Sequence, residues 1–441
     1  MTRGPAKLKT LGAGLALRLG RLAGGTFGSL KVRNYRLYFL GQVVSVSGSW
    51  MQRIAQSWLV LHLTGSAVAL GVVSALQFLP MLLLGAWGGL VADRFDKRRL
   101  LLATQALMGL LALGLALAAL TGVVNVAMVY AFALALGLVT VVDMPARQSF
   151  VIEMVGRRHV TNAVSLNSAV FTGARVIGPA LAGVLISLAG TGWCFLINAA
   201  SFLSVLLALA AMDPRQLHRS EPAARGRGQL RAGVGYAWRN REVRSLLLII
   251  ASVATLALNF NVILPLVARD SFHGDATTFG LLFSTLGLGS LAGALFTASR
   301  RTLGWPVLLG ALLGFGLCLL GAAFAPSLIW ELIVLLPLGV ASLAFQATVN
   351  SMLQLNVEAA FRGRVMALYG VVFVGGSPFG SLLVGWVAEH YGPRSGFVLG
   401  GISVLLTFVA ASHRWRRQRQ VQASTDGPER WRRELRDRAA S

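Results

Sequence analysis

Residues 68–99 read VALGVVSALQFLPMLLLGAWGGLVADRFDKRR. The first part, residues 68–91, contains no Asp, Glu, Lys or Arg, whereas six of the last seven residues are charged. A helix needs about 20 apolar residues to cross the hydrocarbon core of a bilayer. A segment in lipid must also satisfy its own backbone hydrogen bonds. The stretch is therefore predicted to be a membrane-spanning helix that ends in a charged loop.

Eleven more apolar runs of similar length lie along the 441-residue chain. Eight of the twelve runs carry no charged residue, and the other four carry one each, namely Arg53, Asp143, Arg175 and Glu331. The pattern predicts an all-α membrane protein with twelve transmembrane helices. The further runs cover residues 37–61, 100–121, 124–146, 164–188, 193–212, 245–267, 276–298, 305–325, 328–350, 365–388 and 395–412.

The twelve runs fall into two groups of six, separated by a polar stretch rich in Arg. Gly178 and Pro179 in the first group correspond to Ser377 and Pro378 in the second, which indicates two bundles related by pseudo-twofold symmetry. Duplicated halves are typical of transporters, with the substrate site between them near the bilayer midplane. The predicted parts are a basic arm at 1–36, a bundle at 37–212, a linker at 213–244, a bundle at 245–412 and a basic tail at 413–441.

The distribution of positive charge predicts the orientation of the chain. Only 13% of the residues are charged, where a soluble domain has about 25%, yet the net charge is +24. Of the 40 Lys and Arg, 36 fall in the tails and loops on one predicted side of the membrane; the others are Arg53, Arg175, Arg269 and Arg394. The positive-inside rule then places both termini and the linker in the cytoplasm, beside anionic lipid headgroups of the plasma (inner) membrane. Lipid, and not nucleic acid, is the predicted partner of the basic segments.

Several kinds of site are absent from the sequence. No Lys follows a Gly, so there is no P-loop, and neither H-E-x-x-H nor G-x-S-x-G occurs. Cys194 and Cys318 lie in apolar runs without metal-ligand neighbours, so we expect free thiols. The short apolar stretch Leu11–Leu17 is followed by Arg18 and Arg21, which favours a cytoplasmic arm over a signal peptide. No enzyme activity, cofactor or metal is predicted.

The charged loop after the second run carries the most specific motif. Residues 89–99 read GLVADRFDKRR, with Asp93 placed where a carboxylate would cap or face a helix N-terminus. We expect the basic residues that follow to reach a carboxylate on a neighbouring helix, and Asp143 is the candidate. The stretch resembles the signature G-x-x-x-D-(R/K)-x-G-(R/K)-(R/K) of the major facilitator superfamily, with Asp96 in place of the second Gly. The resemblance implies a conformational latch made by Gly89, Asp93, Arg94, Lys97, Arg98 and Asp143, and the alternative is a loop that only sets orientation.

A second motif lies in the fifth run. The residues Ala174-Arg175-Val-Ile-Gly178-Pro179-Ala-Leu-Ala182-Gly183 are similar to the antiporter motif G-x-x-x-G-P-x-x-G-G of drug-efflux branches. Arg175, Gly178, Pro179 and Gly183 are the positions concerned, and Ala174 and Ala182 replace two of the glycines. The wider context resembles the branch that contains macrolide and enterobactin exporters. This resemblance implies export and alternating access.

Polar residues on the first predicted helix follow helical spacing. Gln42, Ser45, Ser49, Gln52 and Gln56 recur every three or four residues, with Arg53 one turn after Ser49. In lipid such a stripe must face protein or water, so it is predicted to line the central cavity or to make bonds between helices. Gln77, Asn259 and Asn261 are weaker candidates on the same argument.

Arg53 and Arg175 lie inside apolar runs, where an Arg at the helix centre costs roughly 2.5–3.5 kcal/mol. They are predicted either to bind an anionic substrate or to pair with helix carbonyls. For Arg175, Asp143 is a further possible partner, and Arg53 could extend its head group toward the outer surface.

These observations predict a secondary transporter that exports small amphipathic molecules of the drug or siderophore type. The family resemblance implies that it works as a monomer. An importer with the same fold and a membrane sensor without transport are the alternatives. Proton coupling is implied by the family resemblance alone, because no acidic residue lies near the centre of a run. Glu331 and Glu389 are predicted at the outer ends.

Overall fold

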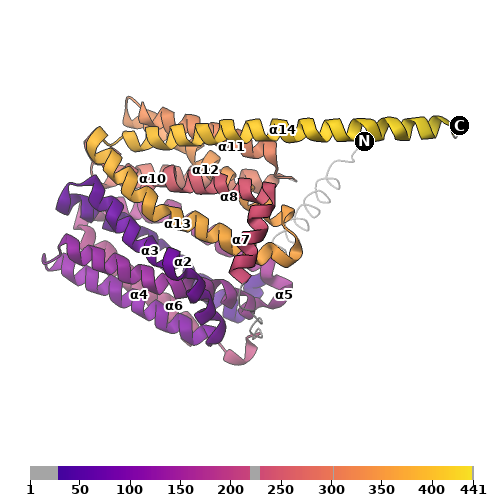
Figure 1. Cartoon of the computed structure of the whole chain (residues 1–441). Coiled ribbons are helices and arrows are strands. Elements are labelled where there is room, and N and C mark those ends of the chain that lie inside the picture. Colours follow the sequence, from indigo (N-terminus) through magenta and orange to yellow (C-terminus); the bar gives the residue numbers. More distant parts are fainter. Residues whose placement is uncertain (1–27, 219–228, 301, 440–441) are drawn as a thin grey trace, which may run out of the picture. The chain divides into compact units, whose positions relative to one another are not determined.

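The computed structural model describes residues 28–218, 229–300 and 302–439, and this part of the chain contains helices and no strand. The arm Leu11–Leu17 and part of the linker lie outside the described residues. The elements are η1 Gly28–Lys31, α2 Arg33–Thr64, α3 Ala67–Arg94, α4 Lys97–Leu120, α5 Val126–Ala189, α6 Thr191–Ala210, η2 Pro214–Gln216, α7 Gln229–Arg239, α8 Arg241–Leu256, α9 Phe260–Leu266, the π-helical turn η3 Val267–Ser271, α10 Ala276–Ser299, α11 Trp305–Ala323, α12 Leu328–Asn356, α13 Ala359–Tyr391 and α14 Ser395–Ala439 (Figure 1).

Eleven segments among the described residues are long and apolar enough to cross a membrane. The first expected span, now α2, is not one of them although it is 32 residues long. Its stripe of Gln and Ser residues, together with Arg53, makes it the most polar of the expected spans. The structure therefore confirms a helical multi-pass membrane protein, with α2 as a twelfth long helix.

The expected fourth and fifth spans are both found, as Val126–Gly156 and Arg158–Ala189, and they are the two arms of α5, which kinks at Gly156. Gly156 has φ = 64°, in the left-handed region that glycine adopts at low cost. The backbone N–H of His218 donates to the Glu153 carbonyl at 2.8 Å, and the His218 ring lies 3.3 Å from where a Cβ at Gly156 would be. The segment after α6 is thus packed against this bend.

The expected seventh span is also irregular, because α8 ends at Leu256 and α9 begins at Phe260. The Asn259 side chain donates to the Thr255 carbonyl at 2.7 Å and so satisfies a backbone acceptor next to the break. Broken spans are tolerated in membranes where neighbouring groups satisfy the freed backbone. The expected span over 245–267 is therefore found within the candidate span Arg241–Ser271, and the break between α8 and α9 is a feature that the sequence did not predict.

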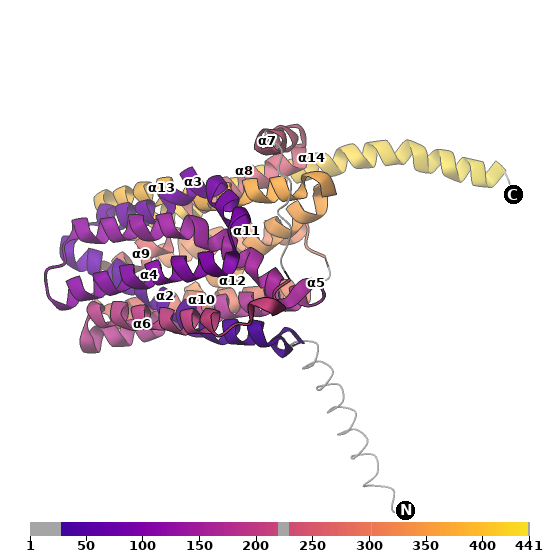
Figure 2. The ribbon, with the colours of Figure 1, turned by 90° about the horizontal axis from the view of Figure 1, so that it is seen from below.

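The described residues divide into two compact units. Unit 1 holds residues 28–69, 76–218 and 274–284, and unit 2 holds the rest. The expected bundle boundary is therefore crossed twice, since the first part of α10 packs with unit 1 and a short part of α3 packs with unit 2. Within unit 1, α6 packs along α2 and α4; within unit 2, α11 packs along α12 and α14 (Figures 1 and 2).

Two segments expected as linker and tail contain helix. In unit 2, α7 is anchored by Tyr236, whose ring stacks on Phe361 with the ring centroids 4.4 Å apart. The backbone N–H of Glu358 also donates to the Tyr236 hydroxyl at 3.4 Å. At the end of the chain, α14 is 45 residues long against 19 for α11, and it projects past that helix (Figure 2).

Gly156→Ala is expected to destabilise the protein by about 1–3 kcal/mol, because φ = 64° with ψ = 173° is a conformation that essentially only glycine adopts. The readout is the thermal unfolding midpoint in detergent. Gly173→Ala on the same helix is the control, since nothing lies within 4 Å of a Cβ at that position. Equal midpoints for the two variants would contradict the assignment of the bend.

Candidate functional site

Two arginines contact one tryptophan in unit 1. The guanidinium carbon of Arg53 lies 4.6 Å from the centroid of the Trp50 ring, and that of Arg175 lies 5.2 Å from it. Trp50 is 8% exposed, and both arginines are partly exposed. Arg53 is one helical turn from Ser49 on α2, and Arg175 comes from the second part of α5. The structure thus brings together the two cations that the sequence placed inside apolar runs.

Neither guanidinium has a hydrogen bond or an acidic partner among the described residues. The two positive charges repel one another. A cation–π contact returns about 0.5–2 kcal/mol, which is less than the roughly 2.5–3.5 kcal/mol that an Arg costs at a helix centre. The contact with Trp50 therefore holds the cations in place without neutralising them, and the cluster has the electrostatics of an anion site.

The position of Trp50 follows from close packing between α2 and α5. A Cβ at Gly178 would lie 2.6 Å from the Trp50 Cβ and 2.9 Å from the Ser47 carbonyl oxygen, so the two helices can approach this closely only with glycine there. The Trp50 ring also packs against Phe283, with the centroids 6.0 Å apart. The predicted motif residue Gly178 thus acts by letting α2 lie directly on α5.

The helix near Pro179 is supported from α10. The Ser284 hydroxyl donates to the Val176 carbonyl at 2.8 Å, close to the turn where Pro179 removes a backbone donor. A Cβ at Gly183 would lie 2.9 Å from the Ala276 carbonyl oxygen, so α5 and the first part of α10 are also in close contact. The four positions of the antiporter-like motif therefore lie on a tightly packed part of unit 1.

Asp275 lies just before α10, and its side chain links α10 to α5. Its carboxylate accepts from the Ser187 hydroxyl at 3.0 Å and from the Thr278 backbone N–H at 3.0 Å. Burial alone would raise the pKa of Asp275, but these hydrogen bonds, with those from the Thr277 and Thr278 hydroxyls, outweigh it and lower the pKa below its ordinary value. The stabilisation that these hydrogen bonds give to the ionised Asp275 is therefore fully present at neutral pH. It is lost as the pH falls through the lowered pKa of Asp275.

The polar stripe of α2 is largely buried. Gln42, Ser45, Gln52 and Gln56 are at most 7% exposed, whereas Ser49 is exposed and donates to the Ser45 carbonyl at 2.9 Å. Gln52 accepts from the Asn198 side chain of α6 at 2.5 Å. For Gln52 the bond between helices is therefore the interpretation that fits. Gln56 retains a buried amide nitrogen without a hydrogen-bond partner.

The weaker polar candidates lie elsewhere. Gln77 is partly exposed on α3, within unit 1. Asn259 and Asn261 belong to unit 2, where Asn259 covers the break before α9 and Asn261 retains a buried side-chain oxygen without a hydrogen-bond partner. The structure groups neither Asn with the Trp50 cluster of unit 1.

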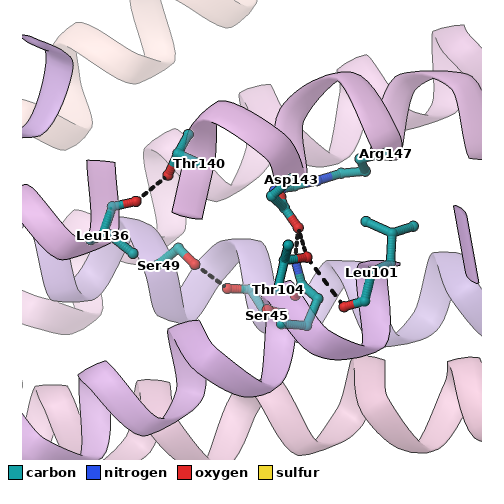
Figure 3. A network of polar contacts seen from close by, with 9 residues as sticks. Ser45, Ser49, Leu101, Thr104, Leu136, Thr140, Asp143 and Arg147 are labelled. Carbon is teal, nitrogen blue, oxygen red and sulfur yellow. Dashed lines mark hydrogen bonds and ion pairs between the residues drawn. The ribbon is translucent and has the colours of Figure 1, made fainter. Parts of the chain in front are cut away.

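Asp143 of α5 is completely buried, and both of its carboxylate oxygens have partners (Figure 3). Its carboxylate accepts from the Thr104 hydroxyl at 2.8 Å and from the Gln105 side chain at 2.7 Å, and it pairs with Arg147 one turn along α5. These contacts join α4 to α5. Asp143 does not pair with Arg175, which removes one of the interpretations of that arginine.

The loop residues after α3 have different partners from those expected. Lys97 pairs at 2.6 Å with Glu153, a carboxylate that the sequence analysis missed, and not with Asp143. The carboxylate that caps α4 is Asp96, which accepts from the Arg99 backbone N–H at 3.0 Å, whereas Asp93 lies in the last turn of α3 with Gly89 and Arg94. Glu153 could have been found as the other acidic residue between Asp143 and the predicted fifth span.

Arg98 binds a helix end. Its guanidinium donates to the carbonyl oxygens of Leu209 at 2.7 Å and Ala210 at 3.0 Å, which are the last acceptors of α6. The first turn of α4 is thus tied to α5 by Lys97 and to α6 by Arg98. These contacts lie within unit 1, and their role as a latch between conformations stays a prediction.

Residues 24–439 match the model of a family described as transmembrane secretion effectors. The chain belongs to this family. A staphyloferrin A transporter of Staphylococcus aureus is 27% identical over 380 residues, which cover 84% of this chain and 93% of the relative. The enterobactin exporter EntS of Escherichia coli is 27% identical and covers 89% of this chain and 95% of its own length. The multidrug efflux pump Tap of Mycobacterium tuberculosis is 26% identical, with 85% of this chain and 92% of Tap covered.

Solved structures show the fold of this secretion effector. The nucleoside transporter NupG is 17% identical with a TM-score of 0.66, covering 87% of this chain and 98% of its own. An occupied, inward-facing bacterial homolog of the human lysosomal transporter Spinster is 15% identical with a TM-score of 0.69, covering 87% and 97%. The predicted resemblance is confirmed: the chain is a multi-pass membrane transporter of the major facilitator superfamily.

Lys97→Met is expected to lower the free energy of unfolding of this transporter by about 3 kcal/mol, because it removes the cation that pairs with the buried Glu153 carboxylate. The double variant Lys97→Met/Glu153→Leu should recover most of the loss, since two apolar side chains can replace a buried pair. Thermal unfolding in detergent measures both. The control is Arg99→Met on the exposed neighbouring Arg99. Additive losses from the two substitutions would show that the pair is not coupled.

Proposed function

We infer that this secretion effector exports a small amphipathic molecule that carries negative charge, from the cytoplasm across the plasma (inner) membrane. The observation that carries the proposal is the pair of guanidinium groups on Trp50, which have no acidic partner among the described residues. An anionic substrate would supply the missing countercharge during each transport cycle. Between cycles, water would solvate the partly exposed arginines.

The geometry favours a particular kind of anion. Guanidinium groups are planar donors that bind carboxylate and related oxyanions through paired hydrogen bonds. Next to them, Trp50 packs against Phe283 of α10, and Trp58 on α2 is a partly exposed apolar ring. A substrate with oxyanion groups beside a flat or apolar part would satisfy both features, whereas a cationic drug would meet two like charges.

The relatives support this substrate class. Two of them are named for siderophores, staphyloferrin A and enterobactin, and the third for several drugs. Each similarity extends over more than four fifths of this chain. A siderophore-type anion is therefore the proposed substrate, and efflux of uncharged amphipathic drugs is a secondary activity of the same site.

Direction and mechanism are proposed from the sequence motifs together with the family. The Gly178–Pro179 motif and the family description both favour export. Alternating access would open and close the site, with the charged residues after α3 as the latch and the pH gradient as the energy source. Both termini are proposed to be cytoplasmic beside anionic lipid, and the working unit is proposed to be a monomer.

Arg175→Lys is expected to weaken transport of a carboxylate siderophore mainly through a higher half-saturation concentration, because Lys keeps the charge but loses the planar fork. Arg175→Gln should nearly abolish transport, because it removes the charge. The measurement is export of the siderophore from cells, with folded yield determined in parallel. The control is Arg269→Gln, since Arg269 is paired with its neighbour Asp270 outside the cluster.

A structural anchor would behave differently from a substrate-binding residue. If Arg175 only joins helices, both substitutions should lower folded yield and leave the half-saturation concentration of the remaining protein unchanged. That outcome would remove the arginine from the substrate site and overturn the proposal for its role.

A further inference from the structure

Glu331 is a fully buried carboxylate that the transport site does not use. It lies in the first turn of α12, is 0% exposed, and neither of its side-chain oxygens has a hydrogen-bond partner. In the predicted topology this end of α12 faces the outer side of the membrane. A carboxylate placed in this way needs an explanation, because buried polar groups in proteins are ordinarily hydrogen-bonded.

The energetic terms around Glu331 decide which form of the carboxyl group is stable. The helix N-terminus favours a negative charge by about 0.3–1 kcal/mol, or about 2 kcal/mol in the most favourable sites. Removing an ion from water costs several kcal/mol. The helix end therefore does not offset burial. An ionised Glu331 needs a countercharge, and without one the group is stable only when it has bound a proton.

One cation is positioned to provide that countercharge. Among the described residues, Arg394 is the charged group that attracts Glu331, and it immediately precedes α14. Its guanidinium does not form an ion pair in this structure and instead lies over the Phe272 ring, 5.3 Å from the centroid. Arg394 therefore lies over an aromatic face while it attracts the Glu331 carboxylate electrostatically.

The other groups near this end of unit 2 do not compete for Glu331. Arg269 and Asp270 pair with each other, and Glu389 and His390 are exposed. The helices α10 and α11 contain no Asp, Glu, Lys or Arg, and the charges of α8 lie at its opposite end. The remaining titratable groups of the elements packed here are His273, Cys318 and Tyr391.

We propose that Glu331 is the proton-binding site that couples transport to the pH gradient, with Arg394 as its alternating countercharge. One proton adds to a carboxylate oxygen of Glu331, whose charge changes from −1 to 0, and Arg394 then rests on Phe272. When the proton leaves, the carboxylate attracts Arg394 away from the ring. This proposal rests on the proposed transport function for its role, although proton binding itself can be measured without substrate.

The experiment labels the purified transporter in liposomes with dicyclohexylcarbodiimide, an apolar reagent that modifies protonated carboxyl groups, and locates the label by mass spectrometry. Label on Glu331 is expected at acidic and neutral pH and should disappear at alkaline pH. Arg394→Gln should retain the label to higher pH, because the countercharge is gone. Absence of label from Glu331 at every pH would overturn the proposal. This readout needs no substrate, so it stands apart from any failure of the anion-export proposal.

Transport then tests the coupling. Glu331→Gln, a neutral side chain of the same shape, should lose export driven by a pH gradient and keep substrate exchange at equilibrium. Glu389→Gln is the matched control, since Glu389 is an exposed acid at the same end. Folded Glu331→Gln protein that still responds to the pH gradient, or wild-type transport driven by a sodium gradient instead, would overturn the proposal.

Discussion

A charge in an apolar medium must find a partner, and this constraint organises the whole transporter. The chain has only 13% charged residues, and most of them lie at helix ends and in loops. The few charges placed inside helices are therefore costly, and most of them contact specific neighbours. Where those neighbours neutralise the charge, the contact stabilises the fold. Where they hold the charge without neutralising it, the site is available for a ligand.

Unit 1 contains both kinds of contact. At one end, the Lys97–Glu153 ion pair joins α4 to α5, and Arg98 binds the end of α6. Asp143 pairs with Arg147 on α5 and joins α5 to α4 through the Thr104 and Gln105 side chains. Nearer the middle of α2 and α5, Arg53 and Arg175 share only the Trp50 ring. The charges at that end are neutralised by their partners. The two arginines on Trp50 are not neutralised by any described residue, and we propose that they bind an anion.

The sequence predicted the helices well because length and hydropathy follow directly from the thickness of the bilayer. It did not predict the break before α9 or the direct junction of the fourth and fifth spans at Gly156, since both depend on local contacts, namely the Asn259 side chain and the packing of His218 at Gly156. It placed Arg53 and Arg175 in apolar runs, but their convergence on Trp50 depends on how closely α2 and α5 approach at Gly178. Lys97 was assigned to the wrong carboxylate for the same reason, because sequence spacing does not show which helices are neighbours.

We propose that Arg53 and Arg175, whose guanidinium groups contact the Trp50 ring, bind the negative charge of the substrate. Calorimetric binding of a carboxylate siderophore and of its neutral methyl ester to the purified transporter tests it most directly. Hydrogen bonds to charged groups contribute about 1.5–3 kcal/mol, so the wild-type protein should bind the acid about 10- to 100-fold more tightly than the ester. The double variant Arg53→Gln/Arg175→Gln should bind both equally. Equal affinity of the wild-type protein for acid and ester would contradict the account.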